Sequence, residues 1–547
     1  MDLSLATYVN AAKRSILLAC APLSVSPILN SMEKHCGRPV NVFYWPNKER
    51  KGTLLVEVES AARLKVCLNN LSEFSRVIHN FPAKEHSIVR CLKLNTFRLC
   101  SDPSYWRVSR PPLLATNLYP PNVNVQKPLV DTRALKIRLQ SCASIDDQAS
   151  LLFNTNCLTY PELLARFTVC DSVQDVLSQI HRDTQVSVFG SVVDGLGSAT
   201  SDLDLVIRLG SDVNPELVDI IDRTNFKHNG PSPNTGVSII PALLAPPQAQ
   251  HMFLSALRNL LVRLDPLGFT GAKVYRGRVP ILHLKKFNLL GVGIDISRVS
   301  NTSSQSEKIH FHDGIHLTQL LRAVNCCVPG FAKCIFVLKF ISRRAGLTRE
   351  GPSPGFTNFK LTMLFVHFLQ AYGYAPSFKL LHHIASDSSH GLSSNPTLTD
   401  LISLPSVDTL LQQFFAYITT LHPSHVVLDL CTGRAIPRDL TTSSVPASLK
   451  LPHVLDDVET SEDEPKVCDS GYVLCPNPIH PNQNILHGVD ETDWANLVEL
   501  CHQWAQALEY NPCPLPGSTG SDWGLLALRK PDSDSGTSVS ACHSIRC

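Results

Sequence analysis

The sequence is poor in aromatic residues and contains no long apolar run. Phe, Trp and Tyr make up 7% of its 547 residues, whereas there are 38 prolines. This balance fits a mixed α/β body with Pro-rich connections better than a coiled coil or a disordered chain. Because no apolar run reaches the roughly 18–20 residues that cross a bilayer, we expect no membrane span. The length exceeds one ordinary core, so we expect two or three domains.

The 18 cysteines include no C-x-x-C pair, which excludes the common zinc-ribbon and thioredoxin-like spacings. Scattered cysteines of this kind are typical of reduced thiols in a non-oxidising compartment. We therefore expect neither a disulfide framework nor a cysteine-based metal site.

Net charge is nearly absent overall, at +2, but it is unevenly distributed. Residues 1–130 hold 17 Lys and Arg against 8 Asp and Glu, so the remainder of the chain is acidic. A basic front end is compatible with a polyanion such as RNA, and equally with a basic linker and a solvated face. The first fifteen residues hold one acidic and two basic residues, a weak pattern for an organelle presequence.

Residues 12–100 show a β-α-β-β-α order. We expect strands at 15–20, 40–45 and 52–59 and helices at 26–36 and 61–71. This order resembles an RNA-recognition motif, and Lys51, Gly52 and Val56 match its third-strand signature. The positions that stack bases in that motif are Thr53, Leu55 and Val58, which lack a π face. We therefore interpret this block as a degenerate, RNA-recognition-motif-like interaction or dimerisation domain.

The remaining boundaries follow from proline content and composition. Residues 101–130 contain six prolines and are predicted to be a linker. We expect a catalytic domain with leading helices at 131–310 and a helical central domain at 311–438. A mobile acidic insertion is expected at 439–467, the C-terminal part of the central domain at 468–530, and a disordered tail at 531–547.

The chemistry is carried by residues 186–209, VSVFGSVVDGLGSATSDLDLVIRL. A short strand runs into Gly190-Ser191, and Asp202 and Asp204 follow in a second strand. Alternate residues of a strand project to the same side, so the two carboxylates are expected together, opposite a buried apolar face. Paired carboxylates repel unless a cation lies between them, and such oxygen donors suit Mg²⁺. The glycine lets a phosphate approach the backbone closely.

A third carboxylate is expected on a neighbouring strand. Residues 280–287 (PILHLKKF) alternate like a strand, and residues 291–297 (GVGIDIS) follow after a short turn. Asp295 lies on the small-residue face of the second of these strands, opposite Val292, Ile294 and Ile296.

The combination of G-S, about ten residues, and D-h-D-h resembles the signature of polymerase-beta-like nucleotidyltransferases. The resemblance implies an α+β fold: a nucleotidyltransferase palm with a helical central domain, preceded here by the degenerate motif domain. It also implies that Asp202, Asp204 and Asp295 are catalytic and hold Mg²⁺ or Mn²⁺ for two-metal nucleotidyl transfer. Gly190 and Ser191 would bind the nucleotide phosphates.

The similarity extends into residues 332–370. The family has a helix ending in K-x-x-x-K/R, and Lys339 and Arg343 stand at this spacing, on one helix face. The resemblance implies that they contact the β- and γ-phosphates. Thr357, Asn358 and Phe359 occupy the position of a small-polar pair plus an aromatic residue. Phe359 is expected to stack on the nucleobase, with a place in the core as the alternative.

Three further stretches, at 144–148 (SIDDQ), 357–363 (TNFKLTM) and 522–526 (DWGLL), resemble the mitochondrial poly(A) polymerase family in particular. The resemblance implies transfer of AMP from ATP to RNA 3′ ends, a homodimer formed through the N-terminal domain, and a mitochondrial location. With a weak presequence, either an upstream segment is missing or the protein acts elsewhere, such as the cytoplasm.

The choice of nucleotide rests on one position. Related uridylyltransferases often place a His before an Asn after the central domain, and the residue before Asn484 here is Gln483. That favours ATP over UTP. The alternatives are a uridylyl- or oligo-adenylyltransferase of the same fold and a non-catalytic RNA-binding scaffold.

Overall fold

The computed structural model divides the chain into two units, each described by itself. The first comprises Met1–Val130 and Asn156–Gln319, and the second Asp131–Thr155 and Leu320–Cys547. The described residues within them are 5–20, 25–46, 52–69, 123–125, 132–181, 183–209, 250–264, 271–276, 279–287, 291–299, 313–348, 354–387, 404–438, 471–481, 483–510 and 522–528.

The N-terminal module is a four-stranded sheet with two of its helices on one face. Its strands lie in the order β1-β3-β2-β4, and α1 (Leu5–Lys13) precedes the first of them. The other elements are β1 (Ser15–Cys20), α2 (Val25–Cys36), β2 (Asn41–Pro46), β3 (Gly52–Glu57), α3 (Ala61–Asn69) and β4 (Asn124–Val125). The five predicted elements are thus confirmed, each within two residues at its ends. Ile16, Leu18 and Val56 of one sheet face form a core with Ile28, Met32 and Leu64 of the helices.

The other face of this sheet packs within the same unit. Leu17, Phe43 and Leu55 belong to the hydrophobic cluster that also contains the residues of α7 (Tyr160–Ile180). Tyr8 of α1 belongs to the same contact, because its ring centroid lies 5.8 Å from that of Phe167 on α7. The face that an RNA-recognition motif would present to RNA is therefore covered by α1 and α7.

Glu57 fixes this contact at the end of β3. It is 1% exposed, and it accepts hydrogen bonds from Arg14 Nη2 at 2.6 Å, Asn41 Nδ2 at 2.7 Å and Tyr160 Oη at 3.3 Å. Burial and the charge of Glu57 raise the pKa of Tyr160 to about 12. Because a buried charge is costly unless paired, Glu57 requires these donors, and Tyr160 is the one that joins the module to α7.

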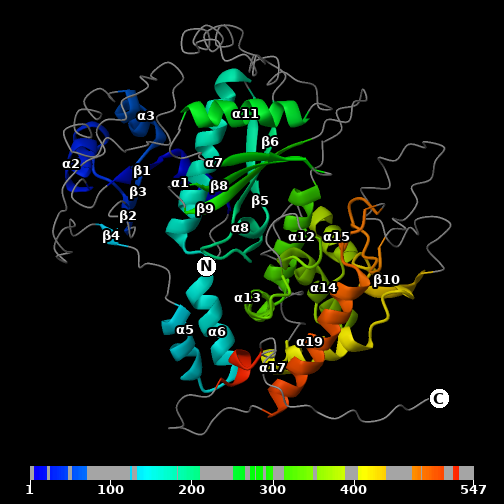
Figure 1. The fold of residues 1–547 in the computed structure, drawn as a ribbon. Coiled ribbons are helices and arrows are strands. Elements are labelled where there is room, and N and C mark those ends of the chain that lie inside the picture. The colour runs from blue at the N-terminus through cyan, green and yellow to red at the C-terminus, as the bar shows by residue number, and fades with distance from the viewer. Residues whose placement is uncertain are drawn as a thin grey trace, which may run out of the picture. The chain divides into compact units, whose positions relative to one another are not determined.

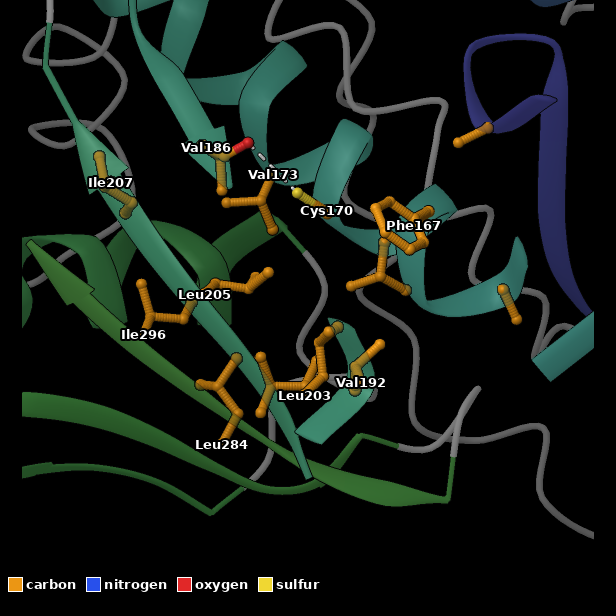
Figure 2. Close-up of a cluster of buried hydrophobic side chains, with 14 of the residues drawn as sticks. Phe167, Cys170, Val173, Val186, Val192, Leu203, Leu205, Ile207, Leu284 and Ile296 are labelled. Atoms are coloured by element: carbon orange, nitrogen blue, oxygen red, sulfur yellow. Dashed lines mark hydrogen bonds between the residues drawn. The ribbon is translucent and has the colours of Figure 1, made fainter. Parts of the chain in front are cut away.

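The palm is a five-stranded mixed sheet in the order β5-β6-β9-β8-β7. Its strands are β5 (Gln185–Phe189), β6 (Leu203–Arg208), β7 (Ala272–Tyr275), β8 (Ile281–Phe287) and β9 (Val292–Arg298). Helix α7 and α11 (Gln250–Leu264) contribute to the cluster on one face, as does Val192 of the short helix α8 (Ser191–Asp194) (Figure 1). Figure 2 shows Leu203, Leu205 and Ile207 of β6 in this cluster, with Ile296 of the neighbouring strand β9 and Leu284 of β8 beyond it. The opposite face of the sheet carries the polar residues.

The second unit is mostly helical. Its helices are α5 (Thr132–Gln140), α6 (Ile145–Asn156), α13 (Phe331–Arg344), α14 (Asn358–Ala371), α15 (Phe378–Asp387), α17 (Val407–Thr420) and α19 (Glu491–Tyr510); α12 (Asp313–Cys327) spans the division, as does the end of α6. A hairpin of β10 (Val426–Asp429) and β11 (Arg434–Pro437) and the 3₁₀ turn η9 (Gly524–Leu526) complete it.

The leading helices α5 and α6 group with this helical unit, whereas we expected them with the palm. Buried Gln148 gives the reason: its Oε1 accepts from Leu525 N at 2.8 Å, and its Nε2 donates to Leu139 O at 3.0 Å. Trp523 Nε1 donates to Gln140 O at 3.1 Å. Helices from before the palm and the turn near the C-terminus are thus joined by hydrogen bonds. The functional domain boundaries remain predictions.

Several predicted segments lie outside the described residues: the insertion at 439–467, the tail at 531–547 and the linker apart from 123–125. Within the described part of the chain, no single helix has the length and apolar composition of a membrane span, and α12 and α13 meet that test only as a bent pair.

Candidate active site

One row of side chains crosses all five strands of the palm on its open face, which is the face opposite the hydrophobic cluster. In register from β5 to β7, the row contains Phe189, Asp204, Asp295, His283 and Lys273. Neighbouring strands of a sheet lie roughly 4.7–4.9 Å apart. The fold therefore places two carboxylates side by side in the middle of the sheet, with an imidazole and an ammonium group beyond them.

The two carboxylates at the centre of the row influence each other strongly. Burial raises the pKa of Asp204 well above its usual value, and the charges of Asp295, Asp202 and Asp194 raise it further. Burial also raises the pKa of Asp295, although the hydrogen bond and charge of His283 oppose this. Like charges brought together in a partly buried site favour protonation unless a cation compensates them.

Asp202 lies just before β6, which begins at Leu203. Its side chain is more exposed than that of Asp204, and its Oδ1 accepts a hydrogen bond from Gly293 N at 3.0 Å. A Cβ at Gly293 would lie 2.7 Å from the same oxygen. The prediction that Asp202 and Asp204 project together is consistent with the influence of Asp202 on the pKa of Asp204. Glycine on β9 is what allows Asp202 to rest against that strand.

Gly190 forms the turn between β5 and α8. Its φ of +70° belongs to the region that favours glycine, and a Cβ there would collide with Asp204 Oδ2. Its N–H donates to Thr318 Oγ1 at 2.8 Å, so the backbone of the turn is held in place. Ser191 follows as the first residue of α8. The structure thus brings the predicted phosphate turn directly beside Asp204.

His283 is a residue of this site that the sequence analysis did not single out. Its Nδ1 lies 2.6 Å from Asp295 Oδ1, and the two side chains are 24% and 26% exposed. With an ionised carboxylate, Nδ1–H donates and fixes the orientation of the Asp295 carboxyl group. Residues 280–287 alternate like a strand, but only the β8–β9 register shows that His283 faces Asp295.

Arg166 supports the segment that leads into Asp202. This buried guanidinium of α7 donates to Ala199 O at 3.0 Å and to Ser201 O at 3.1 Å. Burial lowers its pKa to about 10, against the charges of Glu162 and Asp202, which raise it. Arg166 was not identified from the sequence either. Polar and apolar residues are mixed along α7, so the sequence does not show that this arginine is buried.

The oxygen atoms of Asp202, Asp204 and Asp295 are of the chemical type that binds a hard divalent cation. Carboxylate oxygens are the ligands that Mg²⁺ prefers, and a cation would offset the burial and the repulsion that together raise the pKa of Asp204. As arranged, however, no group of three His, Cys, Asp or Glu side chains among the described residues is set to hold a metal ion. Asp202 uses one oxygen for the Gly293 N–H instead.

Comparison with known proteins shows which proteins the palm resembles. The family described as "Poly(A) RNA polymerase, mitochondrial-like, central palm domain" matches residues 145–307. The mitochondrial poly(A) RNA polymerase of Mus musculus is 23% identical over 459 residues, which are 80% of this chain and 67% of the relative. That of Homo sapiens is 23% identical over 401 residues, 71% of this chain and 60% of the relative. The chain thus spans about two thirds or less of the length of these relatives.

The chain is similar to the mitochondrial poly(A) RNA polymerases. Crystal structures of mtPAP share its fold. The complex of mtPAP with CTP has a TM-score of 0.65 at 20% identity, and the complex with ATPγS has 0.63 at 19%. Both comparisons cover 96% of this chain and 98% of the other. The predicted α+β architecture is therefore confirmed.

The residues that the poly(A) polymerase resemblance assigns to the triphosphate lie in the second unit. Lys339 and Arg343 stand one turn apart on α13, half-buried and exposed respectively. Lys339 Nζ lies 5.7 Å from the centroid of the Phe336 ring. Both positively charged groups are held on one helix face, as the spacing predicted.

The predicted base and ribose contacts open α14. Thr357 is its N-cap, and its Oγ1 accepts from Lys360 N at 3.3 Å, so this threonine has a role in starting the helix. Asn358 and Phe359 are exposed, and 41% of Phe359 is accessible. The alternative that Phe359 is a core residue is therefore wrong, and its ring is available for stacking.

Asn484, which follows the residue used to predict the nucleotide, organises its own loop. Its Oδ1 accepts from Cys475 N and Leu486 N, both at 3.0 Å, and its Nδ2 donates to Val473 O at 2.8 Å. Gln483 beside it is half-buried. The side chain of Asn484 thus holds the loop backbone by three hydrogen bonds, and Gln483 is the residue directly before it.

Proposed function

We propose that this protein is a template-independent RNA 3′-terminal adenylyltransferase, which adds AMP from ATP to RNA. The observation that carries the proposal is the pair Asp204 and Asp295, directly opposite each other on β6 and β9 beside the Gly190-Ser191 turn. A palm of the mitochondrial poly(A) RNA polymerase type supports it. By the same relationship, we propose that the substrate is mitochondrial RNA.

The proposed reaction joins the acceptor O3′ to the α-phosphorus of ATP, while the bond from that phosphorus to the pyrophosphate oxygen breaks. Asp295, oriented by His283, accepts the proton of the attacking hydroxyl. Asp202, Asp204 and Asp295 would hold Mg²⁺ or Mn²⁺, which when bound neutralises the charge that develops on the phosphates. Gly190 and Ser191 cradle the phosphates at the end of β5.

The second unit supplies the remaining proposed nucleotide contacts. Lys339 and Arg343 bind the β- and γ-phosphates, Phe359 stacks on the base, and Thr357 or Asn358 contacts the ribose or a phosphate. The exposure of Phe359 and the common helix face of the two cations support these roles. Gln483 favours ATP over UTP.

The test is extension of a 5′-labelled RNA oligonucleotide by the purified chain with Mg²⁺ and each of the four nucleoside triphosphates, alone and in competition. We expect a ladder of longer products in which ATP is used in preference to the others. Dominant use of UTP would make the protein a uridylyltransferase. Tight RNA binding without any transfer would make it a scaffold.

We propose further that the protein is a homodimer formed through residues 12–100 and that it acts in mitochondria. Because one face of the N-terminal sheet packs against α1 and α7, the dimer contact would use another surface of the module. Light scattering should give twice the chain mass of 60.2 kDa, and a mass of 60.2 kDa would reject the dimer.

A further inference from the structure

The outer edge of the palm's open face carries exposed side chains that lie outside the hydrophobic cluster. On the edge strand β7, Ala272 and Val274 pack against the core cluster, and Lys273 and Tyr275 project from the opposite face. Lys273 is exposed, and 38% of Tyr275 is accessible. Arg276 follows directly after the strand and belongs to the core side of the sheet, where its Nε donates to His251 Nε2 of α11 at 3.1 Å.

Lys273 and Tyr275 continue the row of the proposed active site. Lys273 stands opposite His283 in the β7–β8 register, and His283 stands opposite Asp295. The ring of Tyr275 has its centroid 5.8 Å from the ring of His283. Since neighbouring strands are roughly 4.8 Å apart, Lys273 lies two strands, or roughly 10 Å, from Asp295. Tyr275 and Lys273 are therefore within reach of a substrate bound at that carboxylate.

The direction of the proposed reaction indicates which substrate this is. In transfer to a phosphorus, the attacking and leaving oxygens lie roughly in line. The phosphates of the leaving group belong at the Gly190-Ser191 turn, on the β5 side of Asp204. The attacking hydroxyl must then approach from the opposite side, across β9 and from the direction of β8 and β7. The acceptor RNA is the substrate that carries this hydroxyl.

The chemistry of the edge matches single-stranded RNA. Sequence-independent binding of single strands combines aromatic side chains, on which bases stack, with positive charge along the phosphates. We propose that Tyr275 stacks on a base near the acceptor 3′ end and that Lys273 contacts an adjacent phosphate. This inference rests on the proposed nucleotidyl transfer and adds the path of the acceptor.

The experiment compares Tyr275→Leu, Tyr275→Phe and Lys273→Ala with wild type, and uses Tyr510→Leu as a control. Tyr510 is a 75% exposed tyrosine at the end of α19, so it matches the loss of an exposed aromatic ring. Two quantities are measured with an oligoadenylate: its KM in extension, beside the KM for ATP, and its Kd from fluorescence anisotropy without ATP. Thermal melting reports the folding of each variant.

Tyr275→Leu should raise the KM and Kd for the oligonucleotide roughly 5- to 100-fold while the KM for ATP and the melting temperature stay unchanged. Tyr275→Phe should retain wild-type values, because its ring still stacks. Lys273→Ala should reduce the slope of log Kd against log salt by about 0.7, the loss of one phosphate contact.

Wild-type RNA affinity in Tyr275→Leu, or equal losses in Tyr275→Leu and Tyr510→Leu, would overturn the acceptor path while leaving the proposed activity intact. Equal losses in Tyr275→Leu and Tyr275→Phe would overturn the stacking role. If the wild-type chain transfers no nucleotide, the proposed function fails, and the anisotropy measurement still decides whether Tyr275 binds RNA.

Discussion

At the scale of single residues, the account depends on what surrounds each carboxylate. Asp204 is approached by the backbone of Gly190, and Asp202 by the backbone of Gly293, so two glycines make room for two acids. Asp295 is instead fixed by a side chain, His283. Each acid thus has a distinct neighbour that determines where its oxygens point.

His283 is predicted to act as a positioning residue for Asp295. In asparagine the amide nitrogen stands as many bonds from Cα as Nδ1 does in histidine, whereas in glutamine it stands where Nε2 would be. His283→Asn should therefore keep kcat within roughly threefold, and His283→Gln should lower it roughly 10- to 100-fold, as for residues that orient metal ligands. The measurement is steady-state extension with both KM values and the melting temperature.

A structural role alone would not separate these two variants. Equal activity of His283→Asn and His283→Gln, or a loss of kcat that follows the melting temperature, would contradict the positioning role.

The sequence predicted the acids better than their neighbours. Strand alternation is a local property, so Asp204 and Asp295 could be assigned to polar strand faces without a structure. Contacts across strands depend on register and burial. His283 opposite Asp295 and Arg166 beneath the segment before Asp202 were for this reason found only in the structure.

At the scale of elements, the N-terminal module and α7 behave as one packed body. The rings of Tyr8 and Phe167 are stacked at 5.8 Å, between elements far apart in sequence. We predict that Tyr8→Ala and Phe167→Ala are coupled by about 0.5–1.5 kcal/mol in a double-mutant cycle of unfolding free energy. Tyr8→Ala paired with Leu257→Ala, from α11, should be additive. Additivity of both pairs would mean that the module does not dock on α7.

The pattern of strands could be read from the sequence, but what covers them could not. Replacement of the stacking aromatics by Thr53 and Leu55 predicted a sheet face that contacts protein. Val58, the third such position, lies instead in the core with the helices of the module. The partner, α7, begins about one hundred residues later, and local periodicity carries no information at that distance. The same holds for α6, which Gln148 joins to a turn near the C-terminus.

A buried histidine gives the helical unit a pH-dependent stability. His367 of α14 is fully buried, with Nδ1 2.8 Å from Tyr417 Oη and Nε2 3.2 Å from Arg434 O. Burial lowers its pKa to about 4, so the folded state favours the neutral ring. Its contribution is fully present above the unfolded pKa of about 6.5 and is lost as the pH falls from there toward 4.

Urea unfolding at pH 7, 6, 5 and 4 tests this. Wild type should lose up to about 1.4 kcal/mol per pH unit more than His367→Gln across that window, since glutamine does not titrate. Parallel curves for the two proteins would show that His367 does not carry the effect.

At the scale of the whole molecule, the proposed chemistry draws on both units. The carboxylates belong to the first unit, and Lys339, Arg343 and Phe359 belong to the second. The order of the modules along the chain was predicted from composition and motifs. The assignment of α5 and α6 was not, because it depends on hydrogen bonds to residues near the C-terminus.

Nucleotide choice is predicted to depend on Gln483 in the second unit. Gln483→His should raise the ratio of kcat/KM for UTP over ATP roughly fivefold, about one hydrogen bond in free energy. Gln483→Asn serves as a control that keeps an amide. The loop should survive both changes, because Asn484 holds its backbone. An unchanged ratio in Gln483→His would remove this residue from nucleotide selection.

The most direct test of the account is the rate of AMP addition by Asp204→Asn. This change keeps the size of the side chain and removes one charge at the centre of the row. The account predicts a loss of at least roughly 100-fold against wild type in Mg²⁺, with Asp175→Asn, an exposed acid of α7, unaffected. Extension by Asp204→Asn at the wild-type rate would contradict it.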